Sequence, residues 1–217
     1  MPFISAIEPQ KNNKHRSSLF IDGRFVLGVH NTIVQKQKLS CGKEVDEQAL
    51  ITIAAAEERH QALLYCYRLL SRGSYTEMKI KQKLQNRGYE AVCISEVIEQ
   101  LKQDRYIDDV RYAHALCLRY KNKGAGRYKI KAALMRHGIS DTIVHDSIAA
   151  TLSEADEYAA ARKQAARITE GVKLQFSDPA RIRRIEMSLK SKGFSSSIRA
   201  QVIRELLNTQ SNTGAVS

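Results

Sequence analysis

The chain of 217 residues is poor in the residue types that fill a thick globular core. It has no tryptophan, three prolines and 6% aromatic residues, although 43% of its residues are hydrophobic. This composition is sufficient to bury a core, yet it fits slender helical units better than one thick globule. The sequence has no run of about 18 apolar residues, and its amino terminus lacks the basic start and long apolar stretch of a secretory signal. We therefore expect a cytoplasmic protein.

Sequence motifs that bind metals, redox centres or nucleotides are absent too. The four cysteines lie 24 to 27 residues apart and form no Cys-x-x-Cys pair, and the six histidines form no His-x-x-x-His pair. These spacings argue against a zinc site or a redox motif, and they predict reduced, mostly buried thiols. No Gly-x-x-x-x-Gly-Lys phosphate loop occurs either. We therefore expect no metal, no cofactor and no catalytic residues.

One short pattern does recur, three times along the chain. It consists of an isoleucine, a leucine four residues later, a glycine four residues after that, and then an apolar residue. The copies begin at Ile80, Ile130 and Ile185, at separations of 50 and 55 residues. Isoleucine and leucine at this spacing share one face of a helix, and the glycine suits the left-handed position that ends the helix. A motif repeated at such intervals indicates a tandem array.

Each motif helix has helical neighbours on both sides. An apolar-periodic segment precedes it, and a second amphipathic segment follows the glycine and closes on Leu101, Leu152 or Leu206. The starts carry capping signals: Ser74 and Glu77 predict a capping box for the first motif helix, and Asp178-Pro179 predicts the start of the third. One repeat is therefore a unit of three helices.

The first 45 residues have a different character. Asp22-Gly23 separates two short β-branched and aromatic runs, which predicts a β-hairpin. We therefore predict an all-α fold, a tandem array of three three-helix repeats in an elongated, curved arrangement, with a small N-terminal β-hairpin appendage. The predicted parts are the N-terminal extension (1–45), the first repeat with a lead-in helix (46–106), the basic second repeat (107–153), the third repeat (154–207) and a disordered tail (208–217).

Asp108 and Asp109 are neighbouring carboxylates, a pairing that can serve metal or proton chemistry. They stand where one repeat ends and the next helix begins, so helix capping and the helix dipole explain them better. We assign both residues to holding the first repeat against the second. Metal-dependent hydrolysis by this pair is the weakest hypothesis.

Charge is the strongest functional signal of the sequence. The net charge is +12, and the stretch from Val110 to Ser140 contains eight basic residues and no acidic one. A solvated basic surface that only keeps the chain soluble is one explanation. Uncompensated positive charge repels itself, however, so an acid-free stretch of this length favours an anionic partner, either nucleic acid or an acidic protein surface.

The charge distribution gives two groups of candidate contact residues. The main face comprises Arg111, Arg119, Lys121, Lys123, Arg127, Lys129 and Lys131, and a second group comprises Arg181, Arg183 and Arg184. Tyr112, Tyr120 and Tyr128 lie among these cations and have rings on which bases can stack. The helical spacing of Tyr112 and Tyr120 favours the core for both.

Several segments together resemble the RecX family of recombinase regulators. They are Leu70-Ser71-Arg72 with Ser74 and Glu77, then Lys83-Leu84 with Gly88-Tyr89, then Tyr106-Ile107-Asp108-Asp109 with Tyr112-Ala113, then Lys123-Gly124 through Ile130, and Gly138-Ile139. The resemblance covers about residues 60 to 207 and is densest from Leu63 to Ile139. The N-terminal hairpin resembles an extension found in some members.

The resemblance implies a regulator without catalysis of its own. Members of this family are elongated helical modulators that lie in the groove of the RecA filament on single-stranded DNA. They limit filament extension, ATP turnover and strand exchange, and so restrain recombination and the SOS response. The expected partners are therefore the RecA filament and single-stranded DNA, contacted directly or through the filament, with no membrane and a monomeric chain.

An alternative is a basic helical-repeat protein that binds nucleic acid directly, without the recombinase. Direct DNA binding weakens steeply with salt, because each phosphate contact releases counterions. Salt dependence therefore distinguishes the two hypotheses.

Overall fold

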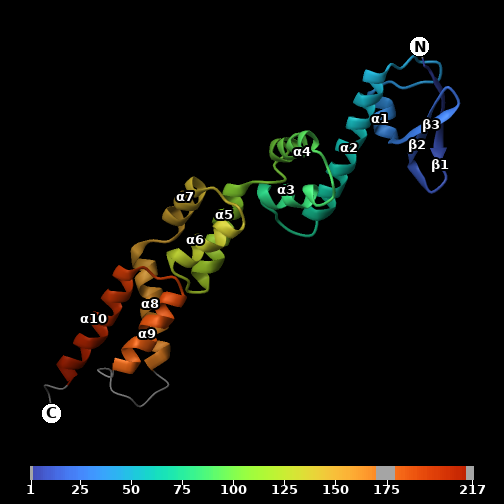
Figure 1. Cartoon of the computed structure of the whole chain (residues 1–217). Helices are drawn as coiled ribbons and strands as arrows, with labels where there is room; N and C mark the ends of the chain where they lie inside the picture. Colours follow the sequence, from blue (N-terminus) through green and yellow to red (C-terminus); the bar gives the residue numbers. More distant parts are fainter. Residues whose placement is uncertain (1, 170–178, 214–217) are drawn as a thin grey trace. The chain divides into compact units, whose positions relative to one another are not determined.

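The computed structural model of the chain describes residues 2–169 and 179–213 (Figure 1). Within these residues the chain forms three strands and ten helices. They fall into two units, each of which is described by itself. The first unit contains the chain up to Tyr75 together with Ile80–Ile107, and the second contains Thr76–Lys79 together with the chain from Asp108 onward.

A three-stranded antiparallel sheet opens the first unit. Its strands, in spatial order, are β1 (Ile4–Gln10), β2 (Asn13–Ile21) and β3 (Arg24–His30). The predicted hairpin is the β2–β3 pair, and both turn residues, Asp22 and Gly23, have positive φ angles, of 48° and 77°. The added strand β1 pairs with β2. Ile4, Leu19 and Val29 are completely buried, so the sheet has a hydrophobic core of its own rather than being a loose appendage.

The helices of the first unit follow the sheet. They are α1 (Asn31–Lys36), α2 (Glu47–Leu70), α3 (Glu77–Gln85, whose first turn belongs to the second unit) and α4 (Ala91–Gln103). Ile53 of α2 joins the core of the sheet, while Ala62 and Cys66, further along α2, pack into a separate core with α3 and α4. The long helix α2 therefore connects the sheet to the first three-helix repeat.

The second unit holds the other two repeats. The second repeat consists of α5 (Asp109–Asn122), α6 (Arg127–Arg136) and α7 (Asp141–Thr151), and the third of α8 (Glu154–Thr169), α9 (Pro179–Ser191) and α10 (Ser196–Thr213). Each repeat has its own hydrophobic cluster. The predicted all-α array of three-helix repeats is confirmed. The predicted end of the last helix near Leu207 is wrong, because α10 continues to Thr213.

The three copies of the sequence motif adopt one geometry. The glycines Gly88, Gly138 and Gly193 have φ angles of +82°, +76° and +82°. In every copy the backbone N–H after the glycine donates to the carbonyl of the motif leucine, at 3.2 to 3.3 Å. This is the Schellman pattern that closes a helix on a left-handed residue. The motif isoleucines and leucines are at most 2% exposed, as their shared helix face predicts.

The predicted start of the first motif helix needs a correction. Helix α3 begins at Glu77, and its cap is Thr76, whose Oγ1 accepts a hydrogen bond from the N–H of Lys79 at 3.3 Å. Ser74 is exposed and lies two residues before the cap residue Thr76. The predicted cap of the third motif helix, Asp178, lies outside the described residues.

Motif helices meet end to end within the second unit. The carbonyl of His137, at the end of α6, accepts a hydrogen bond of 2.7 Å from Thr76 Oγ1. Likewise, the carbonyls of Lys192 and Gly193, at the end of α9, accept hydrogen bonds of 2.9 and 3.0 Å from Gly126 N and Tyr128 N at the start of α6. The carbonyls left free at one helix end thus satisfy donors at the start of another helix.

These end-to-end contacts are close enough to require glycine. A Cβ atom on Gly138 would overlap the side chain of Met78, and one on Gly193 would overlap the backbone of Lys129. A Cβ atom on Gly88 would meet nothing within 4 Å. The three motif glycines therefore share a backbone conformation but not an environment.

This difference predicts unequal costs of substitution. Gly88→Ala should lower the free energy of unfolding by about 1 kcal/mol, the cost of the left-handed conformation alone. Gly193→Ala adds a clash with backbone and should cost about 3 kcal/mol. Urea denaturation followed by circular dichroism measures both values. Equal losses for the two variants would contradict the tight end-to-end contact.

Candidate interaction surface

The structure separates the ten predicted contact residues into two groups. Three of them, Lys121, Arg127 and Arg181, are half-buried or buried in contacts within the second unit. The remaining seven have exposed side chains: Arg111, Arg119, Lys123, Lys129, Lys131, Arg183 and Arg184. The sequence alone does not distinguish the two groups.

Arg127 binds a carboxylate that is completely buried. The backbone N–H of Arg127 donates to Glu157 Oε1 at 3.0 Å, and its guanidinium Nε donates to Glu157 Oε2 at 2.5 Å. Glu157 belongs to α8 and is 0% exposed, whereas Arg127 is the first residue of α6. The carboxylate thus lies at the positive end of the α6 dipole and has a guanidinium partner, which together compensate its burial. We therefore assign Arg127 to the contact between the second and third repeats.

Lys121 makes a second bond between these repeats. Its Nζ lies 2.7 Å from Asp156 Oδ2 and 3.0 Å from the carbonyl oxygen of Thr151. Hydrogen bonds from Lys121 and Ser153 lower the pKa of Asp156 to about 2, so this carboxylate is ionised at neutral pH. Arg181 is 6% exposed inside the third repeat. Lys121 and Arg127 thus bind the second repeat to the third.

Asp108 and Asp109 have the capping roles that the sequence favours, but of the two only Asp109 has a hydrogen bond to the first repeat's helix α3 among the described residues. Asp108 Oδ1 accepts a hydrogen bond of 2.9 Å from the N–H of Arg111 and so caps its own helix, α5. Asp109 Oδ1 accepts one of 3.0 Å from the N–H of Glu77, the first residue of α3. Asp109 thus accepts a hydrogen bond from the first N–H of α3, as Glu157 does from the first N–H of α6. In both cases a carboxylate from the next helix hairpin binds the first N–H of a motif helix.

Sequence reasoning missed Thr76 and Glu157. Thr76 is completely buried. Its hydroxyl donates to the carbonyl of His137 and accepts from the N–H of Lys79. Glu157 stands among other acids in the segment Glu154-Ala-Asp156-Glu157, and nothing in that run distinguishes the one that becomes buried. Only packing reveals the role of either residue.

The exposed members of the predicted main face, on α5, on α6 and just after α5, form the candidate surface, which we call the basic face. It consists of Arg111, Arg119, Lys123, Lys129 and Lys131. In the described part of the chain Arg111, Arg119, Lys123 and Lys129 have no ion-pair partner, and Lys131 lies 3.7 Å from a largely exposed Asp141. An exposed pair of this kind contributes little energy. The positive charge of the basic face is therefore mostly uncompensated.

Apolar side chains are exposed on the same two helices. Leu118 is 49% exposed on α5, and Tyr128 and Met135 are 57% and 49% exposed on α6. Tyr112 and Tyr120 instead pack against the core of the second repeat, as their spacing predicts. Of the three tyrosines, Tyr128 has the ring that remains open for contact with a partner.

In the first two repeats the helix that follows the glycine turn exposes mainly acidic charged residues. In the second repeat this helix is α7, and its exposed charged residues, Asp141 and Asp146, are acidic. In the first repeat it is α4, on which Glu96, Glu99 and one cation, Lys102, are exposed. In a helix-turn-helix protein the helix after the turn enters the major groove of DNA. Acidic residues there would repel phosphates, so α4 and α7 are unsuited to reading bases in this way.

His137 lies at the end of α6 beside Tyr112, with 3.1 Å between its Nδ1 and the tyrosine hydroxyl. Burial lowers the pKa of His137 below the usual value, and the nearby cations Lys79, Arg119 and Arg136 lower it further. The ring is therefore neutral at pH 7. Protonation would place another positive charge beside cations that already repel one another.

The cysteines are free thiols. Cys66, Cys93 and Cys117 are buried, as expected, and Cys41 is exposed. Burial raises the pKa of Cys66 and of Cys93 to about 11, which makes both poor nucleophiles. Among the described residues no group of three or more His, Cys, Asp and Glu is placed to hold a metal ion. None of the described helices is both long and apolar enough to cross a membrane.

These features define a class: a protein built from three-helix repeats whose candidate site is a charged surface. Comparison with known proteins makes the class specific. Three family models match, "Regulatory protein RecX N-terminal domain" over residues 2–46, "RecX, first three-helix domain" over 62–101 and "RecX, second three-helix domain" over 108–147. The chain belongs to the RecX family of non-catalytic regulatory proteins.

Individual relatives agree with this assignment. Regulatory protein RecX of Clostridium tetani is 32% identical over 145 residues, which is 67% of each chain. That of Clostridium beijerinckii is 28% identical over 95% of this chain and 97% of the relative. A crystal structure of regulatory protein RecX superposes with a TM-score of 0.76 at 26% identity, covering 93% of this chain and 98% of the other. RecX from Lactobacillus salivarius gives 0.65 at 25% identity, over 70% and 97%.

The buried carboxylate gives a test of the contact between the second and third repeats. Glu157→Ala should lower the free energy of unfolding by about 2–3 kcal/mol, because buried donors of Arg127 lose their acceptor. The matched control is Glu154→Ala, which removes an exposed carboxylate from the first turn of the same helix. Urea denaturation compares the two variants. Similar losses would rule out the special role of Glu157.

His137 gives a test by pH. Its pKa is lowered on folding, so the unfolded chain takes up the proton first as the pH falls through about 6.5. The contribution of His137 to the free energy of unfolding is therefore fully present above that pH and is lost as the pH falls below it. His137→Gln should show a smaller drop in Tm between pH 7.5 and 5.5 than the wild type does. His145→Gln, at a largely exposed histidine, is the control and should leave the drop unchanged.

Proposed function

We propose that this protein regulates the RecA recombinase by binding the RecA filament on single-stranded DNA. It lies in the filament groove and inhibits filament extension, ATPase activity and strand exchange, which restrains recombination and the SOS response. One observation carries the proposal, namely an uncompensated basic face on a repeat of the RecX family. It supports an anionic partner, since such a surface attracts polyanions and releases their counterions on contact.

The repeat architecture suits a polymeric partner. Each three-helix repeat has its own core, so binding energy can come from many modest contacts on several repeats instead of one deep pocket. Linked contacts strengthen one another, because the first to form raises the effective concentration of the others. A filament offers the same surface again at every protomer.

The second candidate function is direct binding of DNA without the recombinase. Exposed Tyr128 among the cations of α6 favours it, since an aromatic ring can stack on a base. The acidic residues of α4 and α7 argue against reading of bases by the helix after the turn. Direct binding would therefore involve mainly phosphates, show little sequence preference and weaken steeply with salt.

Charge reversal on the basic face tests the proposal. The triple variant Arg119→Glu, Lys123→Glu and Lys129→Glu keeps the structural cations Lys121 and Arg127. Its inhibition of RecA ATPase on single-stranded DNA should weaken by about tenfold or more, because attraction becomes repulsion. The readout is the protein concentration that halves the ATPase rate.

The matched control reverses Lys11, Lys14 and Arg24, which are exposed in the N-terminal sheet, so the net charge changes equally. The control should inhibit like the wild type. Equal inhibition by both triple variants would exclude the basic face. Binding to single-stranded DNA alone, tighter than binding to the filament and with a steep salt slope, would favour the second function.

A further inference from the structure

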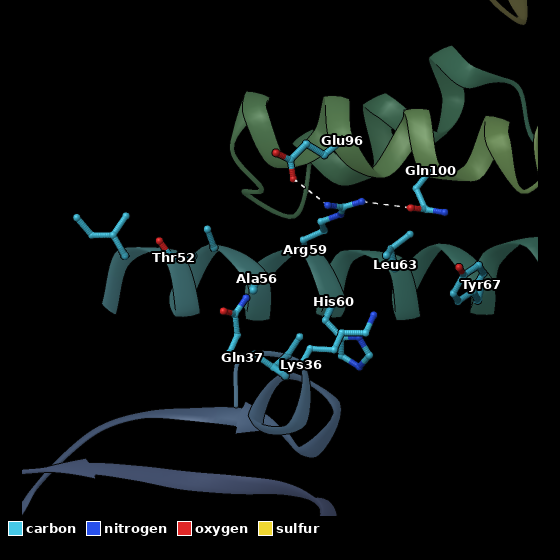
Figure 2. A pocket seen from close by; sticks show the side chains of 13 residues that line it. Lys36, Gln37, Thr52, Ala56, Arg59, His60, Leu63, Tyr67, Glu96 and Gln100 are labelled. Carbon is cyan, nitrogen blue, oxygen red and sulfur yellow. Dashed lines mark hydrogen bonds and ion pairs between the residues drawn. The ribbon is translucent and has the colours of Figure 1, made fainter. Parts of the chain in front are cut away.

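An open groove of about 690 Å³ lies in the first unit, whereas the residues of the basic face belong to the second unit. Helix α2 forms its floor, with α4 along one side and α1 along the other (Figure 2). Its lining residues come from these three helices and from Gln37, which directly follows α1. The function proposed above does not use this groove.

The floor of the groove is long and mostly apolar. It is lined along α2 from Ile51 to Tyr67, with Ala55 and Leu63 between them. These residues follow helical spacing and share one face of α2. Sixteen residues of helix rise about 24 Å, the length of a segment of four to five turns. Ile51 is 54% exposed at one end of this floor.

The sides of the groove carry a positive excess. Lys36 on α1 is exposed and has no ion-pair partner among the described residues. Arg59 crosses from the floor to α4, where it lies 3.5 Å from Glu96 and donates to Gln100 at 3.3 Å (Figure 2). Of the three ionised residues in the lining, two are therefore cations and one is an anion.

His60 also lines the groove, and its ring lies close to several titratable groups. Burial lowers the pKa of His60, and His30, Lys36 and Arg16 lower it further, while Glu57 acts in the opposite direction. Its Nε2 is buried without a hydrogen-bond partner in the described part of the chain. In the lining, the exposed ammonium of Lys36 is the group that would attract a carboxylate.

We propose that this groove binds an amphipathic α-helix of the partner protein, with its apolar face on α2 and a carboxylate toward Lys36 and Arg59. Such a helix would present apolar side chains at the i, i+3, i+4 and i+7 positions, the spacing that fits a groove of this length. The inference rests on the proposed function, because it takes the partner to be the recombinase. It adds a protein contact in the first unit to the basic face of the second.

Two neighbouring alanines give a matched test in the full-length protein. Ala54 and Ala55 are both exposed on α2, but only Ala55 lines the groove. Ala55→Glu places a bulky negative charge on the apolar floor, so its Kd for purified RecA without DNA should rise about tenfold or more. Ala54→Glu changes helix propensity and net charge equally and should stay within about twofold of the wild type. Thermal melts establish that both variants fold.

A second pair of variants tests the charge. Lys36→Glu should raise the Kd by about fivefold, whereas Lys38→Glu, at an exposed lysine outside the groove, should leave it unchanged. A wild type that fails to bind RecA would overturn the proposed function together with this inference. Binding by Ala55→Glu as tight as that of Ala54→Glu would overturn the groove and leave the function standing. A concentration-dependent dimer in analytical ultracentrifugation, lost in Ala55→Glu, would make a second copy of the chain the occupant and overturn the proposal.

Discussion

The contact between the ends of motif helices is the constraint on which the second unit depends. The carbonyls that follow α9 accept hydrogen bonds from Gly126 N and Tyr128 N at the start of α6. The carbonyl of His137, just after α6, accepts one from Thr76 Oγ1. Polar groups at two helix ends thus satisfy part of each other's hydrogen-bonding capacity. The contact requires a backbone without side chains where the chains cross, which explains Gly126, Gly138 and Gly193.

Carboxylates bind other N–H groups at these helix starts, and they also pair with some of the cations of the basic stretch. Asp109 and Glu157 each bind the first N–H of a motif helix, where the helix dipole favours negative charge. Glu157 is buried, and so it also requires a guanidinium, that of Arg127. Lys121 pairs with Asp156, a carboxylate that is only partly buried. Structural contacts therefore engage Lys121 and Arg127, and the exposed cations that were predicted beside them form the basic face.

The function that we propose follows from that remainder. A basic face without compensating acids on one unit and a mostly apolar groove on the other offer two chemically different contacts. The first suits a polyanion or an acidic surface, and the second suits an amphipathic protein segment. A nucleoprotein filament contains both kinds of surface, whereas naked DNA contains only the first.

The sequence by itself determined the repeat and its helix ends. The spacing of isoleucine, leucine and glycine is local information, because a helix face and a left-handed end are set by residues within two turns of each other. The N-terminal turn at Asp22-Gly23 and the capping role of Asp108 were predictable for the same reason. The resemblance to the RecX family also rested on such local signals, and the comparisons confirm it.

Only the tertiary structure decided which charges are available. Lys121, Arg127 and Arg181 look like their neighbours in the sequence, but their roles depend on Asp156, Glu157 and the packing of the third repeat, about 30 residues away for the first two. Local patterns carry no information about such pairs. Two further features depend on helices that meet only after folding: the cap at Thr76 in place of Ser74, and the groove along α2. Neither was predictable, because burial is a property of the packed chain and not of neighbouring residues in the sequence.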